Sequence, residues 1–283
     1  MAWNIISNPQ QVSLPSTDRV KIAILMPHTG NLSTEFIERM WLPLKATALP
    51  WCEKQFLMSR APSLPLARNL LMDNALKSDC EYFLWVDGDM ILEGKDPNEA
   101  LRMMVDLCKQ QPIVTGLYRA KQQHGFNWAI WMYREGMVCK KCQKGYEGFA
   151  GNKCPDTTCG GELEFKKGFI HIESWTGNWF EISVSGLGWC IMRREVLESI
   201  KKAYDKEMLL LDEFKVLYKG DNELIGVKTP FHWDMEGEIS EDFRFLMWAK
   251  KLGYPIWCFS DIRLSHIGSL VVTTESGFRT LAV

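Results

Sequence analysis

The stretch Tyr82-Phe83-Leu84-Trp85-Val86-Asp87-Gly88-Asp89 decides the fold. It begins with an apolar run of strand length, and the carboxylates of Asp87 and Asp89 follow that run directly. In open α/β sheets, ligands bind outside the carboxyl ends of the strands. Carboxylates there offer the hard oxygen ligands that Mg²⁺ and Mn²⁺ prefer. Asp-x-Asp is also common in ordinary turns, but its place after a buried strand favours a metal site.

The segments around this stretch predict an α/β fold. Residues 20–26 form a first apolar strand. Residues 82–86 and residues 112–116 form two further strands. Between them, Asp96-Pro97-Asn98-Glu99 offers a capping residue, a proline for the first helical position and an acid three residues after the cap. A strand, a helix and a strand at this spacing form a βαβ unit. We therefore expect a mostly parallel sheet with flanking helices.

Other elements follow from periodicity. Residues 64–77 predict a helix whose buried stripe is Ala67, Leu70, Leu71 and Ala75, with Arg68 and Asn69 outside the stripe. Later elements are expected as strands over 169–173, 180–184 and 189–192, a helix over 241–252 and a last strand over 256–259.

Composition limits the class of protein. A chain of 283 residues is long enough for one large α/β domain with a small accessory module. The formal net charge of −2 gives no overall attraction to nucleic acid or to anionic membranes. The amino terminus lacks the pattern of a secretory signal, and no apolar run approaches the roughly 18 residues of a membrane span. We therefore expect a soluble, cytoplasmic chain without a membrane span, and the sequence carries no sign of its oligomeric state.

Cysteine spacing predicts a second metal site. Five of the nine cysteines lie scattered among apolar residues, as small buried side chains do. The others form two pairs, Cys139 with Cys142 and Cys154 with Cys159, and glycine follows the second pair. Such knuckles aim four thiolates at one point, as a tetrahedral structural Zn²⁺ site requires. Two disulfides or free thiols are the alternatives, and a reducing compartment favours zinc.

We place this zinc-ribbon-like insertion at 137–165. The second cysteine pair has four intervening residues instead of two, which is a modest departure from the usual knuckle. Lysines line the insertion, and we interpret them mainly as a solvated face, with contact to a polyanion as the alternative. These lysines are Lys140, Lys141, Lys144, Lys153, Lys166 and Lys167.

Ser240-Glu241-Asp242 predicts a helix start that carries acids. A serine cap and two acids in the first turn suit the helix dipole without any further role. Alternatively, one acid accepts a proton as a general base. Adjacent helical residues point about 100° apart, so only one can face a substrate. We predict that Asp242 is the base and that Glu241 is the fallback.

His266 lies near the carboxyl end of the chain, after the last expected strand. A lone histidine at such a place is more often an ordinary packed or surface residue. As a functional residue it would be a third ligand beside Asp87 and Asp89, and Mn²⁺ accepts a mixed nitrogen and oxygen set.

Five short motifs occur in a common order. They are Ala67-Arg68-Asn69, residues 84–90, Gly186-Leu187-Gly188, residues 240–243 and His266-Ile267-Gly268. In this order the chain resembles GT-A glycosyltransferases, and more closely the large inverting family that includes cellulose synthase-like and bacterial polysaccharide enzymes. The match runs from Val20 to Gly268 without the cysteine-rich middle, so residues 1–19 would be an amino-terminal arm and residues 20–283 the transferase domain, interrupted by the insertion.

The resemblance implies a nucleotide-diphosphate sugar as donor and Mn²⁺ or Mg²⁺ as catalytic cofactor. It places Pro27 and Thr29 beside the nucleoside, and Arg68 and Asn69 near the donor. Asp87, Asp89 and His266 would hold the metal and diphosphate, Gly186 and Gly188 would line the sugar and acceptor, and Asp242 would be the base. The Gln-x-x-Arg-Trp motif of processive members is missing, which favours transfer of single sugars. Retaining members share Asp-x-Asp, so the stereochemistry stays open.

Several acceptors and two other functions remain compatible with the sequence. The acceptor would be a glycan, a lipid carrier, a protein or a modified nucleic acid. One alternative is a zinc-ribbon adaptor on a catalytically silent transferase fold that binds nucleic acid or protein, and another is a sugar nucleotidyltransferase. A Rossmann dehydrogenase is disfavoured, since Pro27-His28-Thr29-Gly30-Asn31 stands where its glycine fingerprint would be, and no P-loop is present.

Overall fold

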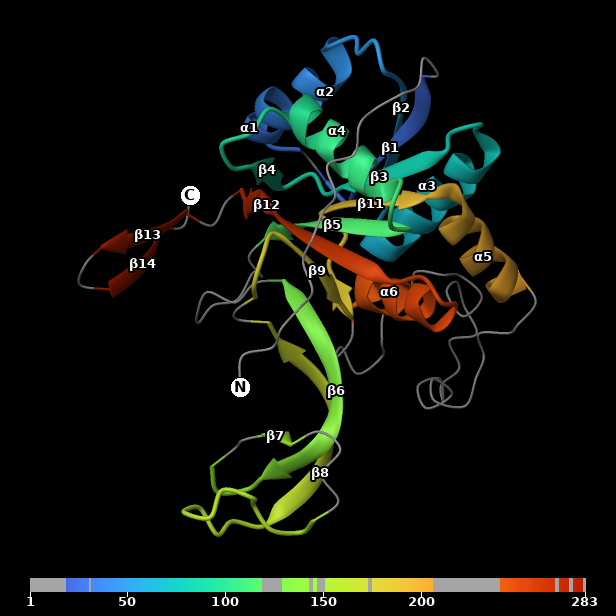
Figure 1. Ribbon diagram of the computed structural model, residues 1–283. Helices are drawn as coiled ribbons and strands as arrows, with labels where there is room; N and C mark the ends of the chain where they lie inside the picture. Colours follow the sequence, from blue (N-terminus) through green and yellow to red (C-terminus); the bar gives the residue numbers. More distant parts are fainter. Residues whose placement is uncertain are drawn as a thin grey trace.

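The computed structural model describes residues 19–30, 32–118, 129–142, 145–146, 151–172, 175–205, 240–267, 270–274 and 277–281. Nearly all of the amino-terminal arm expected over 1–19 lies outside these residues. The described elements form a mixed α/β body, from which one long hairpin and one short hairpin project (Figure 1).

A large sheet forms the centre of the body. Its strand order is β2-β1-β3-β11-β5-β12-β4, and β9 pairs with β12. The strands are β1 (Val20–His28), β2 (Cys52–Arg60), β3 (Tyr82–Val86), β4 (Met90–Leu92), β5 (Ile113–Tyr118), β9 (Trp179–Ile182), β11 (Trp189–Arg193) and β12 (Ile256–His266). β1, β2, β3, β5 and β12 run in one direction, and β4, β9 and β11 run in the other.

The expected mostly parallel sheet is thus confirmed for five strands, whereas β4, β9 and β11 run antiparallel to them. β11 lies antiparallel between β3 and β5, so the two parallel strands of the expected βαβ unit are not neighbours. Because β11 runs the other way, its amino end lies at the same edge as the carboxyl ends of β3 and β5. That edge therefore collects the turn before β11 together with the ends of the parallel strands.

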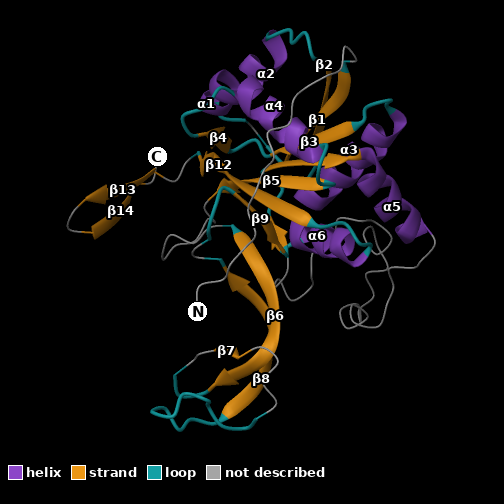
Figure 2. Ribbon diagram, in the orientation of Figure 1, coloured by secondary structure: helices purple, strands orange, loops and turns teal. Residues whose placement is uncertain are grey.

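Helices cover both faces of the sheet (Figure 2). On one face lie α3 (Leu64–Lys77), α5 (Arg194–Asp205) and α6 (Glu241–Lys251), and on the other lie α1 (Thr34–Phe36), the π-helical turn η1 (Ile37–Trp41), α2 (Leu42–Ala46) and α4 (Pro97–Cys108). The side chains of β3 alternate between these layers: Phe83 and Trp85 join the first core cluster, whereas Leu84 and Val86 join the second. Burial of each such side chain contributes about 1.5–3 kcal/mol.

The predicted start of α4 is confirmed. The Asp96 carboxylate accepts hydrogen bonds from the backbone N–H groups of Asn98, at 2.8 Å, and of Glu99, at 3.2 Å. Two of the donors left open at a helix start are thereby satisfied.

The predicted buried stripe of α3 is wrong in part. Leu70 is 44% exposed, while Arg68 and Asn69 are buried. Apolar periodicity could not foresee this orientation, because a buried guanidinium depends on carboxylates from distant parts of the chain.

The cysteine-rich segment forms the outer end of the long hairpin. β6 (Ile130–Cys139) and β8 (Leu163–His171) pair antiparallel from Trp131 opposite His171 to Cys139 opposite Leu163. The short strands β7 (Gly145–Tyr146) and β10 (Val184–Ser185) pair with β6. The insertion expected over 137–165 thus covers the tip of a hairpin whose strands continue to Ile130 and His171.

Three expected strands differ from the structure. The strand expected over 169–173 begins earlier, at Leu163, and ends at His171. The strand expected over 180–184 is divided, since β9 joins the large sheet and β10 joins β6. The strand expected over 256–259 extends to His266, and it is not the last, because β13 (Leu270–Thr274) and β14 (Gly277–Leu281) pair with each other further along the chain. His266 is therefore the last residue of a strand instead of part of a tail.

Candidate functional site

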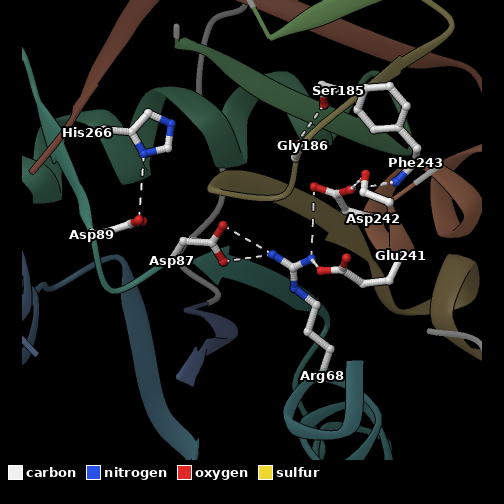
Figure 3. Close-up of polar contacts among 10 residues, drawn as sticks. Arg68, Asp87, Asp89, Ser185, Gly186, Glu241, Asp242, Phe243 and His266 are labelled. Atoms are coloured by element: carbon white, nitrogen blue, oxygen red, sulfur yellow. Dashed lines mark hydrogen bonds and ion pairs between the residues drawn. The ribbon is translucent and has the colours of Figure 1, made fainter. Parts of the chain in front are cut away.

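Polar side chains meet at the carboxyl edge of the large sheet. Asp87 directly follows β3, His266 ends β12, and the Gly186–Gly188 turn precedes β11. Arg68 comes from the start of α3, and the first residues of α6 also reach this edge. Figure 3 shows these side chains converging from elements that are far apart in the sequence.

Arg68 lies at the centre of the carboxylates. Its side chain is 1% exposed, and its Nη2 donates to both oxygens of Asp87, at 2.8 and 3.1 Å. Its Nη1 donates to Oε1 of Glu241 and lies 3.9 Å from Oδ2 of Asp242. Burial alone would lower the pKa of Arg68, but the carboxylates of Asp87, Glu241 and Asp242 more than offset burial and raise it. Arg68 is therefore a permanent cation here.

Glu241 and Asp87, beside Arg68, are less acidic than usual. Burial raises the pKa of Glu241 to about 7, although Arg68 opposes the shift and Asp242 adds to it. Burial also raises the pKa of Asp87, against the effect of Arg68 and with that of the neighbouring Asp89. The edge thus holds more negative groups than one guanidinium can neutralise, and added positive charge would be favourable there.

Asp242 is held by its own helix start. Its Oδ1 accepts a hydrogen bond from the Ser240 hydroxyl and another from the backbone N–H of Phe243, at 2.8 Å. Ser240 occupies the N-cap position, but its hydroxyl bonds Asp242 instead of a backbone N–H. The other oxygen, Oδ2, faces the Gly186 turn, where a Cβ on residue 186 would lie 3.0 Å from it.

The Gly186–Gly188 turn lies close to neighbouring side chains, most tightly at Gly186. A Cβ on residue 186 would collide with the hydroxyl of Tyr118, and a Cβ on residue 188 would lie 2.8 Å from Cε of Met90. The backbone of this turn also accepts a hydrogen bond at Gly188 O from the N–H of Asp87, at 3.1 Å. The turn therefore lies directly against the Asp-Gly-Asp segment.

Tyr118 is a residue of this edge that sequence analysis missed. It ends β5, it packs edge-on against His266 with ring centroids 5.8 Å apart, and burial raises its pKa well above the usual value. Its position at the carboxyl end of a parallel strand was the one available signal.

Asp89 and His266 form a separate pair. The register of β12 and β4 places His266 opposite Met90, and the N–H of Ile267 donates to Asp89 O at 2.7 Å. Nδ1 of His266 lies 3.7 Å from Oδ2 of Asp89. The Asp89 side chain is 39% exposed, and that of His266 is 15% exposed. In Figure 3, Asp87 turns toward Arg68 and Asp89 toward His266, so the structure joins two of the three expected metal ligands.

The remaining expected residues lie around this edge. Pro27 is buried at the end of β1, Thr29 is exposed in the bend beyond it, and Asn69 is buried on α3. β1 adjoins β3, and a Cβ on Gly88 would collide with Leu32 from the segment after β1. That segment therefore packs against the Asp-Gly-Asp turn.

The four clustered cysteines come together at the hairpin tip. Their sulfur atoms all lie within 4.8 Å of one another, with Cys139 and Cys159 at 3.5 Å and Cys142 and Cys154 at 3.8 Å. The structure describes all nine cysteines, and none forms a disulfide. A tetrahedral Zn²⁺ with Zn–S bonds of about 2.3 Å separates its sulfurs by about 3.8 Å. The cluster thus has the dimensions of a four-thiolate metal site.

The backbone supports this cluster. The N–H of Cys142 points at the Cys139 sulfur and holds the pKa of that thiol below its usual value, at about 6. A Cβ on residue 161 would lie 2.5 Å from the same sulfur, so glycine is needed there. Lys140 pairs with Glu162 at 3.3 Å, and Lys141 donates to the carbonyl of Cys159 at 2.8 Å. These two lysines serve the tip itself, which favours a solvated face over a polyanion site.

No helix within the described residues combines the length and the apolar character that crossing a membrane would need.

Comparisons with known proteins add little. No protein-family model matches the sequence, and no curated protein matches it. Among solved structures, the chain aligns with the crystal structure of A197 from STIV at a TM-score of 0.45 and 15% identity, over 88% of this chain and 85% of A197. A likeness of this degree carries no argument about function, which must follow from the chemistry of the two clusters.

Proposed function

We propose that this chain is a GT-A-type, metal-dependent glycosyltransferase that moves a sugar from a nucleotide-diphosphate sugar to an acceptor hydroxyl, with inversion at the anomeric carbon. The observation that carries the proposal is the arrangement at the carboxyl edge. Asp89 with His266 lies on one side of the Gly186–Gly188 turn, and Asp242 lies on the other.

Asp89 and His266 fit a divalent cation. A carboxylate oxygen and an imidazole nitrogen suit Mn²⁺, and both side chains are partly exposed, which leaves room for other ligands. We assign Asp89 as the direct ligand, because both oxygens of Asp87 already bind Arg68. A bound Mn²⁺ or Mg²⁺ would offset the negative charge that grows on the departing diphosphate.

Asp242 fits a general base. It would accept the proton of the acceptor hydroxyl while that oxygen forms a bond to the anomeric carbon and the bond from that carbon to the diphosphate breaks. Because Oδ1 is held by Ser240 and Phe243, Oδ2 is the oxygen available for the proton. General-base help of this kind is worth about 10²–10⁴ in rate. Glu241 is buried against Arg68, so we assign it no proton transfer.

We further propose that the hairpin tip binds one structural Zn²⁺. Its four sulfurs are spaced for tetrahedral coordination by thiolates. The tip lies apart from the carboxylate edge, so we give this metal no part in the transfer (Figure 1).

A ligand panel tests the transferase proposal. Purified chain is mixed with Mn²⁺ and, in turn, with nucleotide-diphosphate sugars and free nucleotides, and the melting temperature is measured. At least one nucleotide-diphosphate sugar should raise it in the presence of Mn²⁺, since a ligand of the native state stabilises by mass action. That donor should also release nucleoside diphosphate, and excess chelator should stop the release. Full turnover in chelator, or no response to any nucleotide, contradicts the proposal.

A further inference from the structure

The guanidinium of Arg68 connects two parts of the carboxylate edge. On one side it binds Asp87, which directly follows β3. On the other side it binds Glu241, the first residue of α6 and 173 residues away in the sequence. The turn that carries Asp89 and the helix that carries Asp242 are therefore joined through a single side chain (Figure 3).

Stability alone is a poor reason for this arrangement. Removing two or three charges from water costs several kcal/mol each, and apolar residues of similar volume often stabilise such sites equally well. A guanidinium with carboxylates on two sides does something an apolar side chain cannot, because its planar fork fixes the orientation of each partner. The geometry therefore favours a role in alignment.

Arg68 has little capacity left for a bound donor. Nη1 and Nη2 both bind carboxylates, and within the described part of the chain Nε is buried without a hydrogen-bond partner. Because the Arg68 side chain is 1% exposed and faces these carboxylates, a diphosphate would have to compete with Asp87 and Glu241 for it. Contact with the donor, which the family resemblance implies for Arg68, is thus less compatible with its surroundings than contact with protein carboxylates.

We propose that Arg68 is a positioning residue that fixes the general base relative to the cation-binding turn. This inference rests on the transferase function proposed above. By holding Glu241, Arg68 fixes the first turn of α6 and so keeps Asp242 beside Gly186. By holding Asp87, it leaves Asp89, two residues on, facing His266. Arg68 itself does not touch the reacting atoms.

Hydrogen exchange and kinetics of Arg68→Lys test this role. Lysine keeps the positive charge but lacks the planar fork that fixes the orientation of a carboxylate on each side. Amides in the first turns of α6, beginning with Arg244, whose N–H donates to Ser240 O at 3.1 Å, should exchange at least ~10-fold faster. The kcat should fall about 10–10²-fold through misalignment, while the Kd of the donor changes less than about threefold.

Two further variants complete the test. Glu241→Gln keeps the shape of the bridge but weakens it, and it should accelerate the same amides by a smaller factor. The matched control is Arg194→Lys, because Arg194 binds backbone carbonyls of Leu76, Ser78 and Cys80 near the other end of α3. The control should leave both α6 exchange and kcat unchanged. If Arg68→Lys does not fold, the exchange rates of the α6 amides in Glu241→Gln alone test the proposal.

The outcomes separate this inference from the transferase proposal. Exchange is measured without donor, so it reports on the bridge even if no donor supports turnover. Unchanged α6 exchange in both Arg68→Lys and Glu241→Gln overturns the inference. Unchanged exchange with a large rise in the Kd of the donor would also overturn it, and would assign Arg68 to donor binding. Absence of turnover in the unaltered chain contradicts only the transferase function.

Discussion

The carboxylate edge and the hairpin tip are both candidate metal sites, but they are built differently. The edge draws on residues from 68 to 266, which strand register and two helix starts bring together. The tip draws on residues 139–161, whose sulfurs and backbone contact one another locally. The edge offers a few partly exposed ligands, whereas the tip offers four thiols, of which Cys139 and Cys154 are buried.

This difference teaches what each metal would do. A closed four-thiolate site supplies folding energy to the segment around it, while an open site keeps positions for substrate. Substitutions at the edge should therefore remove activity and spare the fold. Substitutions at the tip should unfold the tip and spare the chemistry.

The largest effect is expected for Asp89→Ala. Loss of the direct cation ligand should lower turnover by roughly 10³-fold or more. The unfolding free energy should change by less than about 0.5 kcal/mol, because this side chain is partly exposed. Steady-state kinetics with Mn²⁺ and chemical denaturation measure the two quantities, with the exposed Asp73→Ala as control. Substantial activity in Asp89→Ala would end the metal assignment.

Asp242→Asn should lower turnover by about 10² or more while the Kd of the donor stays nearly constant. Asparagine keeps the shape and the hydrogen bond from Phe243 but cannot accept the proton. Single-turnover kinetics and donor titration separate the two effects. If this variant turns over normally and Glu241→Gln is inactive, the base is Glu241. If both variants are active, the inverting mechanism is wrong.

Cys142→Ser tests the proposed zinc site at the hairpin tip. The purified chain should hold about one tightly bound Zn²⁺, and this variant should lose it and expose the tip to hydrogen exchange over residues 151–165. Binding of nucleotide and Mn²⁺ at the edge should persist, and Cys80→Ser should keep its zinc. Elemental analysis and exchange are the measurements. A zinc-free chain with Cys139 and Cys159 disulfide-bonded in reducing buffer would refute the zinc site.

The smallest effect is a pH dependence of stability at Glu241. Its pKa rises from a usual value near 4.3 to about 7, so between these values the folded chain holds a proton that the unfolded chain has lost. The free energy of unfolding therefore falls as pH rises through this window. Glutamine does not titrate, so Glu241→Gln should gain roughly 2 kcal/mol relative to the unaltered chain from pH 5 to 7. Denaturation at several pH values checks this, and a pH-independent difference contradicts it.

The same contrast explains what the sequence could predict. The start of α4 and the cysteine cluster follow from residues close together in the chain, such as Asp96 with Asn98 or Cys139 with Cys142, and both predictions hold in the structure. The α/β class was also predictable, because apolar strands alternate with helices.

Long-range features were not predictable in this way. The place of β11 between β3 and β5 depends on pairing, which no local pattern encodes. Burial of Arg68 depends on Glu241, which is far away in the sequence. We therefore placed Leu70 on the buried face of α3 and Arg68 outside it, and the structure shows the reverse. Tyr118 was missed because its contacts at the edge, with the Gly186 turn and with His266, join residues far apart in the sequence.

The length of the hairpin limits electrostatic interaction between the tip and the carboxylate edge. β6 has ten residues and at roughly 3.3 Å per residue spans about 30 Å, beginning beside Ala129, whose N–H donates to Tyr118 O at 2.7 Å. Mobile ions screen charges over about 8 Å in physiological salt. A change of charge at Lys140 or Lys141 therefore does not change the pKa of Glu241 or of Asp87. Changes of charge at the tip therefore affect the contacts of the tip itself and leave the acidities at the edge constant.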